Sequence, residues 1–138
     1  MIVLDTNVVS ELMRPSPAAE VIGWVRRQEG GSLATTAITV AEIRYGLVLL
    51  PAGRRATQLR HLADDVLAGF PAQVLPFDAE AAALYGDLAA GRERTGHPID
   101  ALDAQIAAIC LCRAAPLATR NAKDFAATGI ELVDPWAV

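Results

Sequence analysis

The chain has 138 residues, enough for one domain with a sizeable core, and its 53% hydrophobic and 20% charged residues exclude a disordered protein. The formal net charge of -4 at pH 7 excludes binding of nucleic acid through bulk positive charge, but not contact with phosphate through a metal ion and a few arginines. No uncharged apolar run reaches the roughly 18 residues of a membrane span, and Asp5 interrupts any signal peptide, so we expect a cytoplasmic protein.

The apolar pattern predicts short strands and helices that alternate along the chain. Ile2, Val3 and Leu4 run directly into Asp5, which is typical of a short buried strand that ends at a carboxylate. Further strands are predicted at 32–36, 74–77, 116–119 and 130–133. Helices are predicted at 8–13, 18–28, 39–50, 54–67, 79–94 and 101–113, with a turn at 121–125. This alternation predicts a single α/β domain over residues 1–138, with a short central parallel β-sheet flanked by helices on both faces.

Local signals set the predicted ends of two helices. Ser16 followed by Pro17 predicts the start of the second helix, because serine is a good N-cap and proline is favoured at the first helical position. Gly30-Gly31 predicts its end. Thr39 followed three residues later by Glu42 matches the capping-box pattern and predicts the start of the third helix.

The cysteines and histidines do not form a recognisable metal site. Cys110 and Cys112 are two residues apart on a predicted helix, so they point to different faces and are expected to be free core cysteines of a reducing compartment. His61 and His97 are isolated and match no zinc spacing. Any metal ion is therefore expected to have oxygen ligands.

Acidic residues stand at the boundaries of several predicted elements. Asp5 ends the first strand, and Glu42 lies in the first turn of its helix. Asp100 and Asp103 stand at the start of the 101–113 helix, and Asp124 follows the fourth strand. Because ligands bind beyond the carboxyl ends of parallel strands, several of these acids are expected in one crevice. Carboxylates crowded together repel one another, and a divalent cation such as Mg²⁺ would relieve that repulsion and activate a water molecule for attack on a phosphodiester.

Each acid also has a simpler explanation. Asp5 can cap the helix that follows it, and Glu42 can complete its capping box. The sequence contains no glycine-rich phosphate loop and no nucleophile elbow that would indicate other chemistry. Composition and spacing alone therefore support an acidic metal-site candidate and nothing more specific.

Four motifs, in order, resemble those of the PIN-domain family. They are LDTNVVSEL near the N-terminus, ITVAEIRYGL around Glu42, DAQIAAICL from Asp103 and ATRNAKDF from Ala118. The resemblance covers the whole chain, and it points to the VapC-type toxins of type II toxin–antitoxin systems. Within these toxins it favours the FitB-like branch, whose members often end in a segment similar to Asp134-Pro135-Trp136.

The resemblance implies an endoribonuclease that depends on Mg²⁺ or Mn²⁺. Water activated by the metal would hydrolyse an RNA phosphodiester and leave 5′-phosphate and 3′-hydroxyl ends. The metal-binding and catalytic acids of the family fall on Asp5, Glu42 and Asp103. The acids would act as metal ligands, and one of them could also accept the proton of the water.

The fourth acid of the family is ambiguous in this chain. Its usual position falls on or near Asn121, which is not acidic, and Asp124 lies one turn further on. We expect Asp124 to be the fourth metal-binding and catalytic acid, with Asn121 as an accessory residue; the alternatives are that Asn121 binds the metal through a water molecule or that one metal site is weak. Thr6 and Thr119 match hydroxyl positions that line such sites, whereas Asp100 matches nothing in the family and is expected to be an N-cap.

The resemblance also implies partners. Toxins of this kind form homodimers and bind a small VapB-type antitoxin whose arginine docks among the acids, and operator DNA is bound only through the antitoxin. At the crevice, Arg44 or Arg120 could hold phosphate. Tyr45, Leu47 and Leu49 could form a groove or dimer face, although Leu47 fits core packing better.

Two other functions remain open from the sequence. One is a catalytically weak PIN module that mainly binds an antitoxin in an operator-DNA complex, and its only support is the amide at Asn121. The other is a metal-dependent nuclease that cleaves DNA, which differs from RNA at the 2′-hydroxyl.

Overall fold

The computed structural model describes residues 1–28, 32–69 and 73–137. Its strands are β1 (Ile2–Leu4), β2 (Leu33–Thr36), β3 (Val74–Leu75), β4 (Leu117–Ala118) and β5 (Leu132–Val133). Its helices are α1 (Thr6–Leu12), α2 (Ala19–Arg27), α3 (Ala37–Val48), α4 (Arg54–Ala68), α5 (Ala79–Arg94), α6 (Ala101–Arg113) and the short 3-10 helix η1 (Ala122–Phe125). Strands and helices alternate as the apolar pattern predicts.

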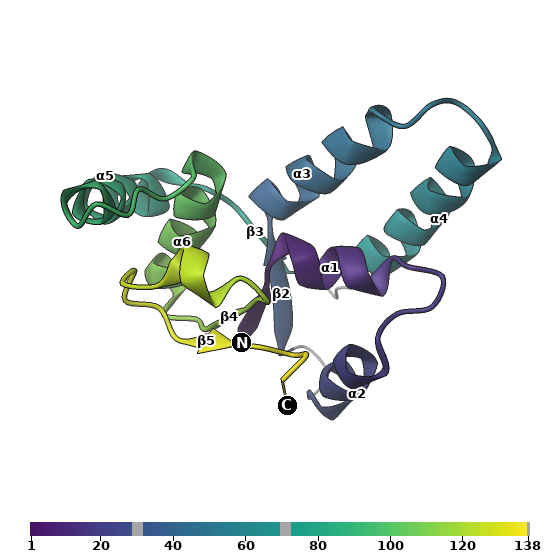
Figure 1. Ribbon diagram of the computed structural model, residues 1–138, viewed down its shortest axis with the longest axis horizontal. Coiled ribbons are helices and arrows are strands. Elements are labelled where there is room, and N and C mark those ends of the chain that lie inside the picture. The colour runs from purple at the N-terminus through teal and green to yellow at the C-terminus, as the bar shows by residue number, and fades with distance from the viewer. Residues whose placement is uncertain (29–31, 70–72, 138) are drawn as a thin grey trace.

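The strands form one parallel sheet in the order β3-β2-β1-β4-β5 (Figure 1). The central strand is β1, in which Val3 pairs with Ala34 of β2 on one side and with Leu117 of β4 on the other. Val3 is fully buried because helices cover both faces of the sheet, which explains why the strand is apolar without alternation. The order of the strands reverses between β1 and β4, so the carboxyl end of β1 lies at the topological switch point, where open α/β sheets bind ligands.

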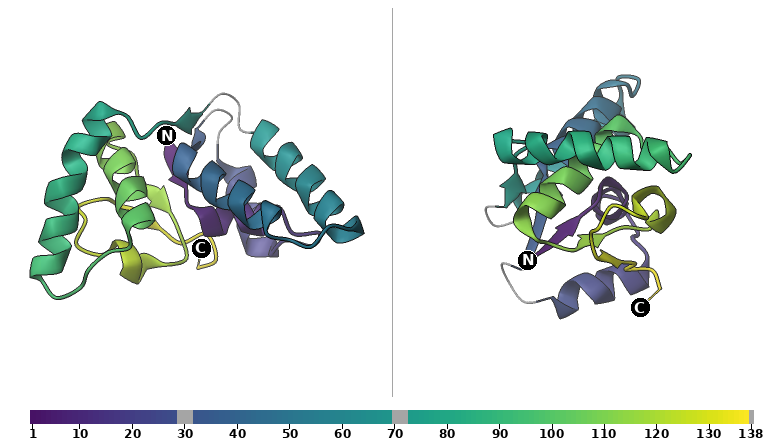
Figure 2. Two further views of the ribbon diagram at one scale, coloured as in Figure 1. Left: turned by 90° about the horizontal axis from the view of Figure 1, so that it is seen from above. Right: turned by 90° about the vertical axis from the view of Figure 1, so that its left-hand side faces the viewer.

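Two layers of helices cover the sheet (Figures 1 and 2). One layer contains α5, α6 and η1, and its buried apolar side chains include Leu88, Ile106 and Phe125. The other contains α1, α2, α3 and α4, and its core includes Val8 and Trp24. The prediction of a parallel sheet with helices on both faces is confirmed.

The helices α3 and α4 form an antiparallel pair that extends away from the sheet (Figure 1). Leu47 faces the core, as expected, and is 6% exposed. Tyr45, Val48 and Leu49 lie on the outer side of α3 and are 67%, 74% and 64% exposed. The end of α3 therefore presents apolar side chains to its surroundings.

The third helix begins earlier than predicted. Its N-cap is Thr36, whose hydroxyl accepts a hydrogen bond from the Thr39 backbone N–H at 3.1 Å. The predicted capping box of Thr39 and Glu42 is therefore wrong, because Thr36 already has the extended backbone of an N-cap and α3 starts directly after it. Glu42 consequently lies beyond the first turn, and its side chain is free to face α1.

The second helix begins later than predicted. Ser16 and Pro17 do not start it, because the N-cap is Ala18 and the first helical residue is Ala19. The backbone N–H of Ala18 donates to the carboxylate of Glu11 at 2.9 Å, so a side chain from α1 fixes this start. The predicted end at Gly30-Gly31 lies outside the described residues.

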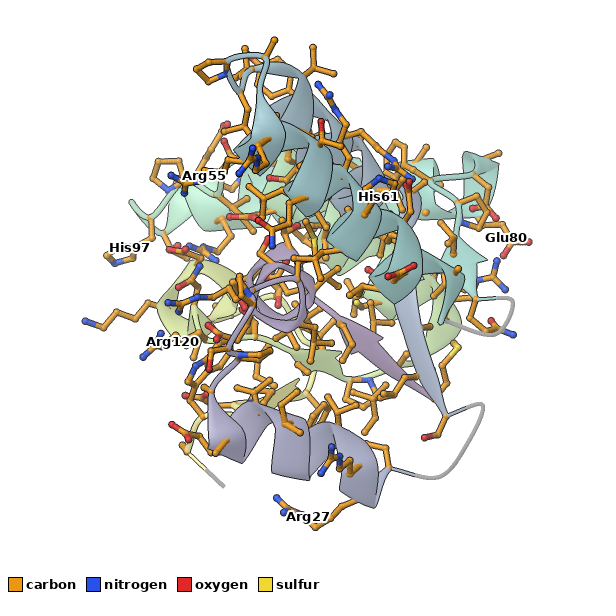
Figure 3. The ribbon with its side chains drawn as sticks, turned by 90° about the vertical axis from the view of Figure 1, so that its right-hand side faces the viewer. Arg27, Arg55, His61, Glu80, His97 and Arg120 are labelled. Carbon is orange, nitrogen blue, oxygen red and sulfur yellow. The ribbon has the colours of Figure 1, made fainter. Side chains whose placement is uncertain are left out.

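Most other local predictions are confirmed. Asp100 is the N-cap of α6 and accepts hydrogen bonds from two backbone N–H groups of its first turn. Cys110 and Cys112 are free, as expected; Cys110 lies in the core, where burial raises the pKa of its thiol to about 12, whereas Cys112 is only partly buried, so its predicted core position is wrong. His61 and His97 lie on different sides of the molecule (Figure 3). No helix in the described part of the chain combines the length and hydrophobicity needed to cross a membrane.

Candidate active site

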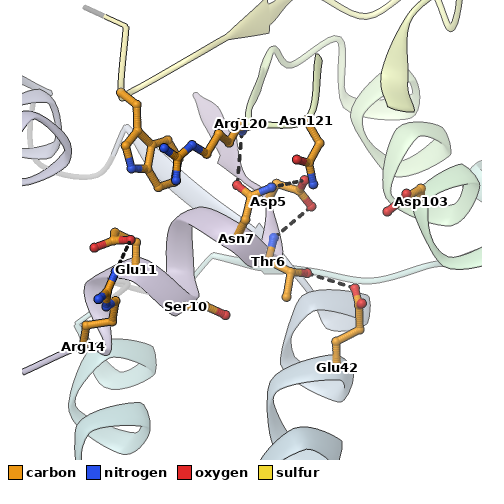
Figure 4. A pocket seen from close by; sticks show the side chains of 11 residues that line it. Asp5, Thr6, Asn7, Ser10, Glu11, Arg14, Glu42, Asp103, Arg120 and Asn121 are labelled. Atoms are coloured by element: carbon orange, nitrogen blue, oxygen red, sulfur yellow. Dashed lines mark hydrogen bonds and ion pairs between the residues drawn. The ribbon is translucent and has the colours of Figure 1, made fainter. Parts of the chain in front are cut away.

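A cavity of about 590 Å³ opens at the carboxyl end of β1 (Figure 4). Its walls come from the start of α1, from α3, from the first turn of α6 and from the segment that follows β4. The lining residues are Asp5, Thr6, Asn7, Ser10, Glu11, Arg14, Glu42, Asp103, Arg120, Asn121 and Trp136.

Asp5 lies at the centre of the cavity floor and is 3% exposed. One oxygen of its carboxylate, Oδ1, accepts a hydrogen bond from the Thr6 backbone N–H at 2.8 Å. The other, Oδ2, accepts hydrogen bonds from the Thr119 hydroxyl at 2.7 Å and the Asn7 amide at 3.3 Å. Asp5 is therefore the N-cap of α1 and also a carboxylate held in one orientation by three donors.

A polar network ties the end of β4 to α1. The Asn7 side-chain amide donates to the Thr119 hydroxyl at 3.2 Å, and its carbonyl oxygen accepts the Arg120 backbone N–H at 3.2 Å. The Thr119 hydroxyl also accepts the Asn121 backbone N–H at 3.0 Å. These bonds fix the segment after β4 against the carboxylate of Asp5.

Glu42 reaches the cavity from α3. Its Oε1 accepts a hydrogen bond from the Thr6 hydroxyl at 2.9 Å, and that hydroxyl lies 3.1 Å from the hydroxyl of Thr39. Thr6 therefore links two carboxylates, through its backbone N–H to Asp5 and through its side chain to Glu42 (Figure 4).

Asp103 faces this pair from the first turn of α6. Partial burial, followed by repulsion from Asp5 and the other nearby acids, raises the pKa of Asp103 from 3.8 to about 7. Burial is also the main reason that the pKa values of Asp5 and Glu42 are raised. The three acids therefore share a site in which full ionisation is unfavourable without a compensating cation.

These acids fit a hard divalent cation. Carboxylate oxygens are the ligands that Mg²⁺ and Mn²⁺ prefer, and Mg²⁺ usually keeps several waters beside one or two carboxylates. Among the described residues, no group of three acidic, histidine or cysteine side chains has an arrangement that could hold a metal ion by itself. A cation here would therefore be bound by one or two of Asp5, Glu42 and Asp103, with water completing its shell.

The structure brings most of the predicted site residues together. Thr6 and Asn121 line the cavity beside the three acids, and Thr119 lies behind Asp5 as its hydrogen-bond donor. Asp124 is exposed and does not line the cavity, although its charge contributes to the raised pKa values of Asp5 and Asp103.

The two arginines suggested for phosphate lie in different settings. Arg120 lines the cavity. Arg44 instead forms an exposed ion pair with Asp64 of α4 at 2.7 Å and is not part of the cavity wall. The structure therefore places only Arg120 of the two at the site.

Several lining residues were not anticipated from the sequence. Asn7, Ser10, Glu11 and Arg14 follow the spacing that places residues on one face of a helix. The prediction of a helix that starts at residue 8 hid this face, because α1 starts two residues earlier. Glu11 is buried, and Oε1 of its carboxylate accepts a hydrogen bond from the Arg14 guanidinium at 3.4 Å.

Comparison with known proteins places this geometry in a family. The model of the PIN-domain family matches residues 2–131. The chain belongs to the PIN-domain family. Within it, this PIN domain is 42% identical over 137 residues to VapC ribonuclease Y4jK of Sinorhizobium fredii, with 99% of this chain and 98% of that protein covered.

Two further similarities are to the toxin FitB of Neisseria gonorrhoeae and to a solved FitAB structure. The PIN domain is 36% identical over 137 residues to the toxin FitB, with 99% of both chains covered. A chain from a solved structure of FitAB bound to an IR36 DNA fragment superposes with a TM-score of 0.91 at 35% identity, covering 100% of this chain and 97% of that chain. These matches confirm the resemblance to VapC-type toxins of the FitB-like branch.

Proposed function

We propose that this PIN domain, extending over residues 1–138, is the toxin of a type II toxin–antitoxin system and acts in the cytoplasm as a metal-dependent endoribonuclease. The main support is the meeting of Asp5, Glu42 and Asp103 in one cavity at the switch point of the sheet. The similarity to a VapC ribonuclease at 42% identity favours RNA over DNA as the substrate.

Asp5, Glu42 and Asp103 are the proposed metal-binding acids: one or two of them would bind Mg²⁺ or Mn²⁺ directly, and the remaining carboxylates would contact its water shell. When bound, such an ion supplies an activated water and offsets negative charge at the phosphate. Thr119 and Thr6 orient the carboxylate of Asp5, and Thr6 also orients that of Glu42, so the oxygens that face the cavity are positioned before any ligand enters. Asp103 closes the opposite side.

Asn121 and Asp124 are the two candidates for the position of the fourth acid in the PIN-domain family. Asn121 lines the cavity, and its amide oxygen could accept a hydrogen bond from a metal-bound water. Asp124 is too peripheral to line the cavity in this structure, but its negative charge reaches the site. We therefore assign the direct accessory role to Asn121 and an electrostatic role to Asp124.

The proposed partners follow from the same site. An arginine side chain from a VapB-type antitoxin would neutralise the crowded carboxylates and block a cation. The exposed apolar side chains at the end of α3, Tyr45, Val48 and Leu49, would be covered in a homodimer or an antitoxin complex. The net charge of -4 agrees with operator DNA being bound only through the antitoxin.

The deciding experiment is end-mapping of total RNA incubated with purified, antitoxin-free protein and Mg²⁺ or Mn²⁺. Wild-type protein should create new 5′-phosphate ends at discrete sites, and Asp5→Asn should create none. Asp87→Asn, an exposed acid on α5, is the matched control and should cleave like wild type. If wild type and Asp5→Asn produced the same 5′-phosphate ends in equal amounts, the proposed ribonuclease activity would be refuted.

The catalytically weak PIN module is the alternative favoured by the amide at Asn121. It predicts a folded protein that binds antitoxin but yields no new RNA ends and shows no Mg²⁺ or Mn²⁺ binding by calorimetry. A single-stranded DNA of the mapped sequence, incubated in parallel, tests the DNA nuclease. If the protein cleaved this DNA in preference to the RNA, DNA would become the proposed substrate.

A further inference from the structure

The cavity has two chemically different sides. Glu42 and Asp103 form the acidic side, whereas Arg14 and Arg120 lie on the other (Figure 4). Trp136 also lines the cavity, and the guanidinium of Arg120 lies over its ring, with the central carbon 4.8 Å from the ring centroid. A flat cation and an aromatic ring therefore stand beside the proposed cleavage site.

Packing and hydrogen bonds fix the position of both residues in this arginine–tryptophan pair. Trp136 packs against the core cluster beneath α1 and α2, and its backbone N–H donates to the Asp134 carboxylate at 2.9 Å. The backbone N–H of Arg120 donates to the Asn7 side chain at 3.2 Å. Asn7 also donates to Asp5, so the pair is tied to the acidic centre through one side chain.

Within the described residues, Arg120 forms no ion pair with a carboxylate. The described residues contain ion pairs for Arg14 with Glu11 and for Arg44 with Asp64, but none for Arg120. Arg120 is exposed and lines the cavity, so a ligand that enters the cavity can reach its guanidinium (Figure 3 shows Arg120 at the surface). Guanidinium planes stack on the unpaired bases of single-stranded RNA.

We propose that Arg120, held flat on Trp136, is the stacking platform for the base of the nucleotide next to the scissile phosphate in single-stranded RNA. The inference rests on the proposed ribonuclease function and deepens it. It makes Arg120 a specificity-determining residue whose planar shape matters as well as its charge. Lysine keeps the charge but loses the plane, so Arg120→Lys separates stacking from simple phosphate attraction.

The test uses a short single-stranded RNA that contains one site mapped with the wild-type protein. Single-turnover cleavage is compared for wild type, Arg120→Lys and Arg113→Lys, with the last as a matched control at the far end of α6. Each protein is also given RNAs that lack the base on the 5′ or the 3′ side of the cleaved bond. Loss of one stacked base should slow cleavage by wild type about tenfold, and Arg120→Lys on the intact RNA should show a similar loss.

The two changes should not add. Arg120→Lys should cleave the intact RNA and one of the two abasic RNAs at the same rate, because the missing base had nothing left to stack on. Additive losses at both positions, or a rate for Arg120→Lys within twofold of wild type, would overturn the platform. If wild type cleaves no RNA, the proposed function fails, and this result is distinct from cleavage that is insensitive to Arg120→Lys.

A binding measurement provides a second readout. The RNA carries 2-aminopurine at the candidate base and is bound to the Asp5→Asn protein, which is expected not to cleave it. Stacking of the base on Arg120 should quench the 2-aminopurine fluorescence. In the double variant that carries both Asp5→Asn and Arg120→Lys, the fluorescence should be restored. Equal quenching with arginine and lysine would show that the base stacks elsewhere, and the inference would be wrong.

Discussion

Asp103→Asn should make the metal-free protein more stable at neutral pH. Its pKa is raised to about 7 in the folded protein, mainly by burial, so the folded state retains a proton that the unfolded state has lost. Between about pH 4 and pH 7 the free energy of unfolding of the wild type therefore falls as the pH rises. Asparagine cannot ionise, so the variant avoids this part of the loss.

The magnitude follows from the same pKa. A displacement from 3.8 to about 7 corresponds to about 4 kcal/mol for a group shielded from solvent. Asp103 is only half-buried, and solvent screens its interactions, so we expect about 1–2 kcal/mol at pH 7.5. For a chain of this length, that gain raises Tm by about 3–8 °C.

The assay is thermal unfolding followed by circular dichroism in EDTA at pH 4.5 and pH 7.5. Asp103→Asn should exceed wild type in Tm at pH 7.5 and approach it at pH 4.5, and Asp87→Asn should follow wild type at both. Added Mg²⁺ should raise the Tm of wild type more than that of Asp103→Asn. A variant less stable than wild type by the same amount at both pH values would refute the reasoning, because it would assign Asp103 a packing role.

Three further predictions concern residues around the site. Thr119→Val removes the hydroxyl that donates to Asp5 at 2.7 Å, so the free energy of unfolding in urea should fall by about 1–3 kcal/mol, and by more at pH 8 than at pH 5. Thr119→Ser keeps the hydroxyl and should not lower the free energy of unfolding in this way. Arg92→Met removes a buried guanidinium that donates to the backbone carbonyls of His97, in the loop after α5, and of Asp124 and Ala126 at η1. It should lower the free energy of unfolding in urea by about 2–4 kcal/mol; a loss no larger than that of the same change at the exposed arginine two residues later would contradict this role. Cys112 should react with a thiol reagent in the native protein, and Cys110 only after unfolding, as mass spectrometry of the labelled protein would show. Labelling of Cys110 before Cys112 would contradict the burial of Cys110.

The sequence predicts well where local signals agree with the tertiary structure. α5 and α6 begin after Asp78 and Asp100, each of which has the side chain and the extended neighbourhood of an N-cap, and both helices match their predicted limits. β1 is recognised because three apolar residues precede a carboxylate. The family motifs point to Asp5, Glu42 and Asp103, and the fold brings these acids together, although their role as ligands remains a prediction.

Prediction fails where the sequence offers two equivalent signals or where distant segments meet. Thr36 and Thr39 are both good caps, and only the extension of β2 as far as Thr36 decides that α3 starts there. Arg120 and Trp136 meet because β5 pairs with β4 in one register and returns the chain to the cavity. No local pattern reports that register, so the arginine–tryptophan side of the site could not be derived from the sequence.

The pairing of Asp5 with Thr119 has a consequence for the synthesis of the protein. The two residues are 114 positions apart, and β1 lies between β2 and β4, so β1 is synthesised long before β4, one of its two neighbours in the sheet. Until β4 emerges, Asp5 lacks its hydroxyl donor and the cavity lacks the wall that carries Arg120. Contacts so distant in sequence form late in folding. The cavity of this PIN domain is therefore completed only after β4 and the segment that follows it have been synthesised.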